Sequence, residues 1–432
     1  MGDWMKPDVL GLHEGHEVPS SVRSREAVVA RYKKHVNRGF AGLASVLGLP
    51  IGVRSSGCFV FDETGEAYLD CGGYGVFIHG HCHPRIVEAV KAQVERHPLT
   101  THGFLNAELA MAAEHLADVT PMGLDYVTFT NSGAEAAELG IKLARLNGKT
   151  HLVAAEGGFH GKTMGALSVN GRSIYKEPFR PLLPGVDFVK YGDASALCRV
   201  LDCNQQCSCV ILEPVQGEAG VNIPPEGYLE EVLTLCRRYG ALLILDEIQT
   251  GLGRLGAWWG ADREGVVPDI LLAGKGLSGG VVPVAAVVAT PEIFEPLNND
   301  PFLHSSTFGG NPLAMVAANT AIEVIQSEGL VEKAARLGEA LLASLRAILF
   351  GNCGGLLVEL RGVGLMLGLE FVSEAVAGDF VLRLLQEKVV VSHSLNAHRV
   401  VRLTPPAIFS DVECEVLMRA VDRASSSLRH AW

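Results

Sequence analysis

Residues 241–254 read ALLILDEIQTGLGR, an unbroken apolar run followed by two acidic residues and a glycine-rich segment. Similar apolar runs lie at 208–213, 269–273 and 282–289, and residues 227–239 show helical periodicity between two of them. Continuous runs, rather than alternating ones, are typical of strands that are buried on both faces of a parallel sheet. The segment therefore predicts an α/β fold with an open, mostly parallel central sheet covered by helices.

The C-terminal quarter has a different pattern. Leucines at helical spacing predict an amphipathic helix over 330–349, and strands are expected around two glycines within 355–371. A last helix is expected from Asp411, with Ser410 or Asp411 as its cap. We find no internal repeat and no low-complexity linker in the chain.

Length and composition limit the class of protein. A chain of 432 residues exceeds one ordinary domain and predicts two domains, or one large α/β unit with a satellite. With 48% hydrophobic and 19% charged residues the chain is not disordered, and a net charge of −12 disfavours nucleic acid and anionic membranes as partners. No apolar stretch approaches the ~20 residues of a spanning helix. The first eighteen residues contain no secretory signal pattern, so we expect a cytoplasmic protein.

Two clusters contain residues that can bind metals. The cysteines of CNQQCSC (203–209) match no common zinc-ligand spacing, and we interpret this segment as an exposed loop. The histidines of HGHCHP (79–84) alternate and precede a proline, which favours a strand or turn leading into a helix from Arg85. Ten cysteines in the whole chain are too few for a disulfide scaffold. We therefore predict neither a metal site nor disulfides.

Residues 130–148, TNSGAEAAELGIKLARLNG, indicate a helix with a well-defined start. Ser132 is expected to cap it in a capping box with Glu135, and Gly148 to end it. The free N–H groups of Ser132, Gly133 and Ala134 would also form a site for a phosphate, because no bulky side chain covers them. A structural cap and an anion site are compatible here.

Two charged residues follow buried strands. Asp246 ends the apolar run of 241–245, and a buried carboxylate requires a cationic partner, either a structural arginine or a bound group. Lys275 in DILLAGKGLSGG lies between glycines after another run; it is either a surface lysine or a desolvated amine with a lowered pKa that can act as a nucleophile. The segment EGGFHGKT is not a nucleotide-binding phosphate loop, because Glu156 occupies a required glycine position.

Together these groups indicate one cofactor. An amine that forms an imine, a carboxylate that faces a pyridinium nitrogen and a helix start that holds a phosphate are the requirements of pyridoxal 5′-phosphate. The segments NSGAEAAE, FHGKT, EPVQGEAG, LDEIQTGLGR, STFGGNPLA and RLTPP, with the Lys275 segment before the last two, occur in this chain in the order of the class III, fold-type I aminotransferases. The chain resembles this family from about residue 40 to residue 425.

Within the family, the chain is most similar to the putrescine and ornithine aminotransferases. DPFLHSSTFGGNPLA and SLNAHRVVRLTPP resemble the putrescine enzymes, whereas YLDCGGYGVFIHGHCHP also resembles the ornithine enzymes. The resemblance implies a fold-type I transferase with a large cofactor-binding domain over 73–327. It also implies a smaller α+β domain built from both termini, residues 1–72 and 328–432.

The resemblance implies catalytic roles for two residues. Lys275 is expected to form the imine with the cofactor and to carry the proton between the substrate carbon and the C4′ carbon. Asp246 is expected to keep the ring nitrogen protonated. Phe159 and Ile248 are expected on the two faces of the ring, with Ile248 at a position where valine is common, and Gln249 near the phenolic oxygen.

The same resemblance implies the rest of the cofactor site. Ser132, Gly133 and Ala134 are expected to bind the phosphate, and Thr307 to reach the phosphate of the neighbouring subunit, which makes a homodimer the smallest active unit. His160 and Glu213 complete the expected set, with Glu213 in a supporting position.

Three residues are expected to select the substrate. Arg402 matches the family's arginine for the α-carboxylate of glutamate or 2-oxoglutarate. Glu218 matches the glutamate that pairs with this arginine when the bound end of the substrate is uncharged. Tyr74 matches a tyrosine of the ornithine enzymes, where putrescine enzymes usually have phenylalanine. These matches leave the donor as a diamine or an ω-amino acid.

The sequence therefore predicts a ping-pong transaminase that moves an amino group from an ω-amino donor to a 2-oxo acid. Other reactions on the same scaffold stay open, namely decarboxylation of a dialkylated amino acid, an aminomutase or an epimerase. The pairing of Glu218 with Arg402 favours transamination over these. A cofactor-binding regulator without catalysis is disfavoured, because Lys275, Asp246 and Arg402 are all present.

Overall fold

The structure, a computed structural model, describes residues 24–100 and 103–432. The beginning of the chain, where we expect no secretory signal, lies outside the described residues. Within the described ranges, no helix combines the length and the apolar character that crossing a membrane requires.

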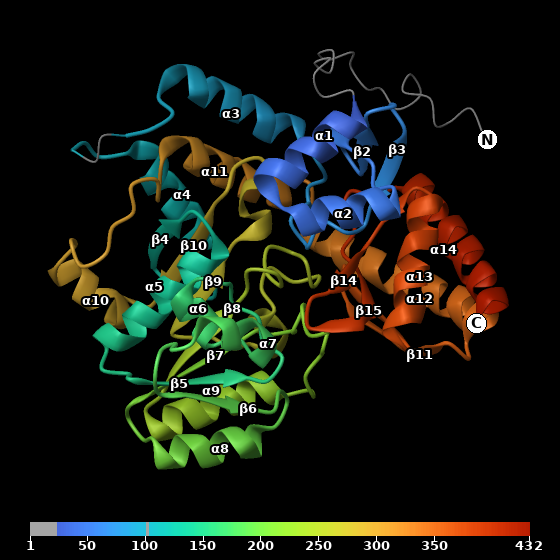
Figure 1. Cartoon of the computed structure of the whole chain (residues 1–432). Coiled ribbons are helices and arrows are strands. Elements are labelled where there is room, and N and C mark those ends of the chain that lie inside the picture. The colour runs from blue at the N-terminus through green and yellow to red at the C-terminus, as the bar shows by residue number, and fades with distance from the viewer. Residues whose placement is uncertain (1–23, 101–102) are drawn as a thin grey trace.

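The central sheet contains the predicted apolar runs (Figure 1). In the described part of the chain it has seven strands, in the order β4 (Tyr126–Thr130), β10 (Ala285–Ala289), β9 (Ile270–Ala273), β8 (Leu242–Asp246), β7 (Ser208–Leu212), β5 (His151–Ala155) and β6 (Val186–Val189). The pairs from β9 to β6 are parallel, and β10 is antiparallel to both of its neighbours. The mostly parallel sheet is confirmed, although the run at 282–289 forms a strand only from Ala285, after Pro283.

Both faces of this sheet are buried, which is why its strands are continuously apolar. On β8, Ile244 packs with α5 (Gly133–Leu146) on one face, while Leu243 and Leu245 face the opposite side. That opposite side is covered by four helices: α4 (Ala107–Asp118), α8 (Ala194–Cys203), α9 (Tyr228–Tyr239) and α11 (Pro312–Ser327). The helix expected at 227–239 is α9.

A smaller α+β part combines both ends of the described chain, seen at the right of Figure 1. Its first sheet pairs β1 (Gly52–Ser56), β2 (Phe59–Asp62) and β3 (Ala67–Asp70) with the C-terminal β13 (Val389–Val390). Its second sheet contains β11 (Leu357–Val363), β12 (Met366–Phe371), β15 (Ala397–Leu403) and β14 (Ser392–Ser394). The helices α12 (Leu330–Cys353), α13 (Glu374–Gln386) and α14 (Asp411–Ala431) pack together beside them. The domain boundaries after residues 72 and 327 stay predictions.

The remaining elements are short or peripheral. They are α1 (Arg25–Arg31), the π-helical turn η4 (Tyr32–Val36), α2 (Arg38–Leu47), α3 (Pro84–Arg96), α6 (Met164–Ser168), α7 (Ser173–Lys176), α10 (Pro291–Asn299), and the 3₁₀ helices η5 (Glu177–Phe179), η6 (Ala261–Glu264) and η7 (Lys275–Ser278).

The predicted helix caps are present, with one difference. Ser410 caps α14 in a full capping box with Glu413. Ser132 caps α5, and its hydroxyl accepts a hydrogen bond from the backbone N–H of Glu135. The Glu135 carboxylate, however, accepts from the N–H of Asn131 rather than from that of Ser132. The predicted reciprocal capping box is therefore wrong by one residue.

The histidine and cysteine clusters are dispersed among different contacts. His79 contacts the Ala321 carbonyl, His81 pairs with Asp70, and His83 pairs with Glu328, just before α3 begins at Pro84. The exposed-loop interpretation fits residues 204–207, which form a turn, and Cys203 is exposed although it is the last residue of α8. The interpretation is wrong for Cys209, which is buried in β7. Among the described residues, no group of three or more His, Cys, Asp or Glu side chains is arranged to hold a metal ion.

Candidate active site

A cavity of about 220 Å³ opens at the carboxyl ends of β5, β7, β8 and β9, where open α/β sheets bind their ligands. Segments that follow different strands contribute to its wall. The lining residues are Gly133, Ala134, Phe159, His160, Gly161, Glu213, Glu218, Asp246, Ile248, Gln249 and Lys275. Ten of them belong to the set expected from the sequence, and Gly161 lies within the FHGKT segment.

Lys275 is a partly buried amine at the cavity wall and not an exposed surface lysine. It follows β9 directly and begins the short helix η7, with a positive φ of 48°. Burial lowers the pKa of Lys275 to about 8, with Arg402 acting in the same direction against three carboxylates. Because an unprotonated amine is the nucleophilic form, this environment suits covalent chemistry near neutral pH.

The cationic partner of Asp246 is a histidine and not an arginine. Oδ2 of Asp246 lies 2.7 Å from Nδ1 of His160, and its Oδ1 accepts a hydrogen bond from the backbone N–H of Ile248. Both side chains are almost fully buried. Burial lowers the pKa of His160, but its hydrogen bond to Asp246 and the charge of this carboxylate outweigh burial and raise that pKa overall. Two hydrogen bonds thus hold the Asp246 carboxylate in place at the cavity wall.

We predict that Asp246→Asn preserves the shape of the site and removes its charge. The rate of the chemical step should fall by at least about 10²-fold, the lower end of what a positioned proton or charge supplies. Single-turnover absorbance measurements on the cofactor-loaded protein would give this rate. Asp187→Asn, at an exposed position beside His151, is the matched control and should keep the wild-type rate. A near-wild-type rate in Asp246→Asn would refute the role.

The start of α5 forms another wall of the cavity. Gly133 and Ala134 line it, whereas Ser132 is exposed and does not. The packing here excludes larger side chains: a Cβ at Gly161 would lie 2.6 Å from that of Ala134. The unpaired N–H groups at this helix start therefore remain open to an anion. Thr307 is exposed and lies outside the cavity wall of its own chain.

Glu213 connects two parts of the wall. Its Oε1 accepts a hydrogen bond from the backbone N–H of Phe159 at 3.0 Å, and its Oε2 accepts from that of Gly217 at 3.3 Å. Burial raises the pKa of Glu213 to about 7. Glu213 thereby fixes the backbone that carries Phe159. Phe159 and Ile248 both line the cavity, and their placement on opposite faces of a cofactor ring stays a prediction.

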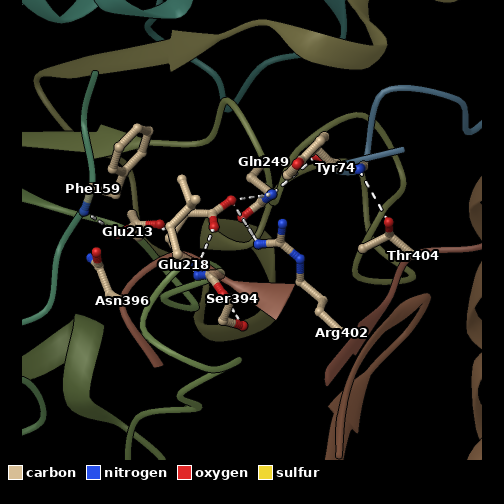
Figure 2. A network of polar contacts seen from close by, with 12 residues as sticks. Tyr74, Phe159, Glu213, Glu218, Gln249, Ser394, Asn396, Arg402 and Thr404 are labelled. Carbon is tan, nitrogen blue, oxygen red and sulfur yellow. Dashed lines mark hydrogen bonds and ion pairs between the residues drawn. The ribbon is translucent and has the colours of Figure 1, made fainter. Parts of the chain in front are cut away.

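Glu218 and Arg402 form a buried ion pair at the other side of the cavity (Figure 2). Nη1 of Arg402 donates to Oε1 of Glu218 at 2.7 Å and to Oε1 of Gln249 at 3.3 Å. Burial raises the pKa of Glu218, but the charges of Arg402 and Lys275 lower it below its ordinary value. Nε and Nη2 of Arg402 are buried and have no hydrogen-bond partner among the described residues. One edge of the guanidinium therefore carries two buried donors without a protein partner, and Arg402 itself lies behind the residues that line the cavity.

Tyr74 forms the open side of this region. Its φ of 53° is in the left-handed region, and about half of the residue is exposed. The guanidinium carbon of Arg402 lies 5.6 Å from the centre of the Tyr74 ring, and Gln249 donates a hydrogen bond to the Tyr74 carbonyl. The predicted substrate residues Tyr74, Glu218 and Arg402 are thus close together, although they are far apart in sequence.

Sequence reasoning missed the turn between β14 and β15. The backbone N–H of Leu395 donates to Oε2 of Glu218 at 3.0 Å, and that of Asn396 donates to the Glu218 carbonyl at 2.7 Å. These are main-chain contacts, so no residue type marks them in the sequence. Only the position of SLNAHRVV directly before Arg402 could have drawn attention to this segment.

The fold and this site define a pyridoxal-phosphate enzyme of fold type I. The family described as aminotransferase class-III matches residues 47–424, and the chain belongs to this family. Family membership confirms the resemblance seen in the sequence, and with it an aminotransferase that uses pyridoxal phosphate.

Solved structures of related enzymes are similar over nearly the whole chain. An ornithine aminotransferase from Toxoplasma gondii, described with partial occupancy of PLP at its active site, is 33% identical, has a TM-score of 0.88, and the match covers 95% of this chain and 96% of that one. An (S)-enantioselective omega-transaminase from Thermomicrobium roseum is 30% identical, with a TM-score of 0.86 and coverage of 94% and 99%. An omega-transaminase from Pseudomonas jessenii in complex with PMP is 26% identical, with a TM-score of 0.84 and coverage of 90% and 95%.

The residues of this chain fit the cofactor. The cavity holds one partly buried amine of lowered pKa, one buried carboxylate that is hydrogen-bonded to a histidine, and the start of one helix. Nε2 of His160 has no hydrogen-bond partner in the described structure, which leaves a polar atom at the wall. These groups match the aldehyde, ring nitrogen and phosphate of pyridoxal 5′-phosphate.

Proposed function

We propose that the protein moves an amino group from an ω-amino donor to a 2-oxo acid such as 2-oxoglutarate, in two alternating half-reactions. The donor is a diamine such as putrescine or an ornithine-like ω-amino acid. The observation that carries this proposal is the buried Glu218–Arg402 pair, in which the arginine keeps two unpaired donors.

The charges of the site support this reaction. The cofactor, when bound, supplies an electron-withdrawing ring that stabilises negative charge on the substrate carbon. Nζ of Lys275 is placed to take the proton from that carbon and return it, because its lowered pKa makes the amine available as a base. Asp246, held by His160, supplies the negative charge that favours a protonated ring nitrogen.

Arg402 suits the acceptor. A guanidinium binds a carboxylate through two parallel N–H groups, and Nε with Nη2 is such a pair on Arg402. The α-carboxylate of a 2-oxo acid can bind these donors directly. Because the guanidinium is fully buried, the interaction is stronger than on a surface.

Glu218 suits the donor. An ω-amine brings a cationic or apolar end to the place where the acceptor brings a carboxylate, and an unneutralised arginine there would repel it. Glu218, 2.7 Å from Arg402, cancels that charge. The Tyr74 hydroxyl can hydrogen-bond an amine or carboxylate of the donor, which keeps ornithine-like donors beside simple diamines.

The dimer is part of the proposal. Thr307 is expected to reach the phosphate in the neighbouring subunit, and its exposed position outside its own cavity is compatible with that role. Tyr74 is also about half exposed, so a second chain could contact it. Sedimentation equilibrium of the active enzyme would contradict this part if it found only monomers.

A donor screen tests the reaction itself. We expect glutamate to form from 2-oxoglutarate with putrescine, ornithine or a close homologue, and no more than trace glutamate with short α-amino acids such as alanine. Glutamate is measured by chromatography, with the Lys275→Ala protein as blank. If no ω-amine yields glutamate above this blank, the proposed donor class is wrong.

A further inference from the structure

The turn between β14 and β15, residues Ser394, Leu395 and Asn396, contacts Glu218 through the backbone N–H groups of Leu395 and Asn396. Figure 2 labels Ser394, Asn396, Glu218 and Arg402 in this region. The Leu395 N–H donates to Oε2 of Glu218, while Arg402 donates to Oε1 of the same carboxylate. Glu218 can make both bonds only in the paired position. The turn therefore favours the state in which Arg402 is neutralised.

The turn is held firmly on several sides. Nδ2 of Asn396 donates a hydrogen bond to the carbonyl oxygen of Gly157 at 2.7 Å. The Ser394 hydroxyl donates to the carbonyl oxygen of Gly217 at 3.4 Å. Gly220 packs closely behind it: at a φ of 111°, a Cβ there would lie 3.2 Å from that of Ala397. Each contact joins the turn to segments that also form the cavity wall.

Two side chains at α7, Tyr175 and the N-cap residue Arg172, donate hydrogen bonds to the Leu395 carbonyl. The Tyr175 hydroxyl donates to it at 3.0 Å and Nη1 of Arg172 at 3.3 Å. Nζ of Lys162, in the FHGKT segment, lies 4.6 Å from the centre of the Tyr175 ring, a cation–π contact that favours this ring position. Tyr175 and Arg172 line no part of the cavity, so they reach Glu218 only through the turn.

We infer that Tyr175 and Arg172 are positioning residues that set substrate preference, because they fix the 394–396 turn that holds Glu218 against Arg402. This inference rests on the proposed function of the Glu218–Arg402 pair. When the turn is loosened, Glu218 pairs less well, Arg402 is freer for a carboxylate, and an ω-amine meets more positive charge.

The test compares Tyr175→Phe and the double variant Tyr175→Phe/Arg172→Met with the wild-type holoenzyme. The probe is glutarate, a five-carbon dicarboxylate that cannot react, and its dissociation constant is measured by calorimetry. We expect glutarate to bind about fivefold more tightly to Tyr175→Phe, because the net contribution of one hydrogen bond changes an equilibrium constant by about this factor. Binding to the double variant should be at least about tenfold tighter than to wild type. The half-reaction with putrescine or ornithine should slow by similar factors. Unchanged or weaker glutarate binding in both variants would overturn the inference.

Two controls separate this effect from a general loss of structure. Tyr68→Phe removes a hydroxyl that bonds Asp62 on β2 and Lys388, neither of which belongs to the 394–396 turn, and should leave glutarate binding unchanged. In a Glu218→Gln background, Tyr175→Phe should no longer alter glutarate binding, and an effect that persists there would also overturn the inference.

The measurements distinguish an error in the inference about the 394–396 turn from an error in the proposed function. If wild type converts no ω-amine, the proposed function fails. If wild type does convert one, and Glu218→Gln changes glutarate binding while neither Tyr175→Phe nor the double variant tightens it, only the inference about the turn is wrong.

Discussion

Lys275→Ala should bind the cofactor but lose at least about 10⁴-fold in turnover, the upper end of what positioned proton transfer contributes. The variant loses both the amine that bonds the cofactor and the base that moves the substrate proton. The lowered pKa of Lys275, about 8, suits it to both tasks, and among the described residues it is the one lysine that lines this cavity. Steady-state rates and the absorbance of the bound cofactor check this result.

A chemical measurement identifies the lysine independently. Treatment of the wild-type holoenzyme with borohydride should fix the cofactor on Lys275, as peptide mapping would show. Lys149→Ala is the matched control, since this lysine is bonded to backbone carbonyls of Gln206 and Gly240 away from the cavity. If the fixed cofactor maps to another lysine, the assignment of Lys275 as the cofactor-binding lysine is wrong.

Arg402→Ala should weaken the binding of 2-oxoglutarate by about 2–5 kcal/mol, or roughly 30- to 5,000-fold, as is typical when one member of a buried charge pair is truncated. The acceptor loses its bidentate partner, and Glu218 is left with a buried charge that repels a carboxylate. The acceptor concentration dependence of the second half-reaction gives this affinity. Arg383→Ala, which breaks an ion pair with Asp379 on α13, is the control and should leave it unchanged.

Much of the fold follows from local pattern. The runs that form β7, β8 and β9 are apolar without interruption because each strand is covered on both faces, and this single fact predicts the parallel sheet. The Ser410 cap and the amphipathic helix α12 depend on contacts within one segment, so they too could be read correctly.

Other features depend on contacts between distant segments, which one sequence does not encode locally. The partner of Asp246 is His160, 86 positions away, and nothing around Asp246 distinguishes a histidine from the arginine that we also considered. The Glu135 carboxylate accepts a hydrogen bond from the N–H of Asn131 and not from the predicted N–H of Ser132. The donor is thus shifted by one residue at a helix end, where several N–H groups are available.

The candidate site itself could be predicted mostly through family resemblance. Lys275 and Asp246 carry their own chemical signal, but Glu218 and Arg402 look like ordinary surface charges until the fold brings them to 2.7 Å. The 394–396 turn acts through its backbone, so its residue types carry no signal for that role.

The Glu218–Arg402 pair is the centre of the proposed dual specificity, and one comparison tests it most directly. Glu218→Gln keeps the shape of the side chain and removes the charge that neutralises Arg402. The two half-reactions of this variant are followed separately by cofactor absorbance in stopped flow. We predict that the half-reaction with putrescine or ornithine slows by about 30-fold or more, the lower end of the cost of breaking a buried pair, while that with glutamate is unchanged or faster. Equal slowing of both half-reactions would mean that the pair is only structural and would contradict the proposed use of one cavity for two kinds of substrate.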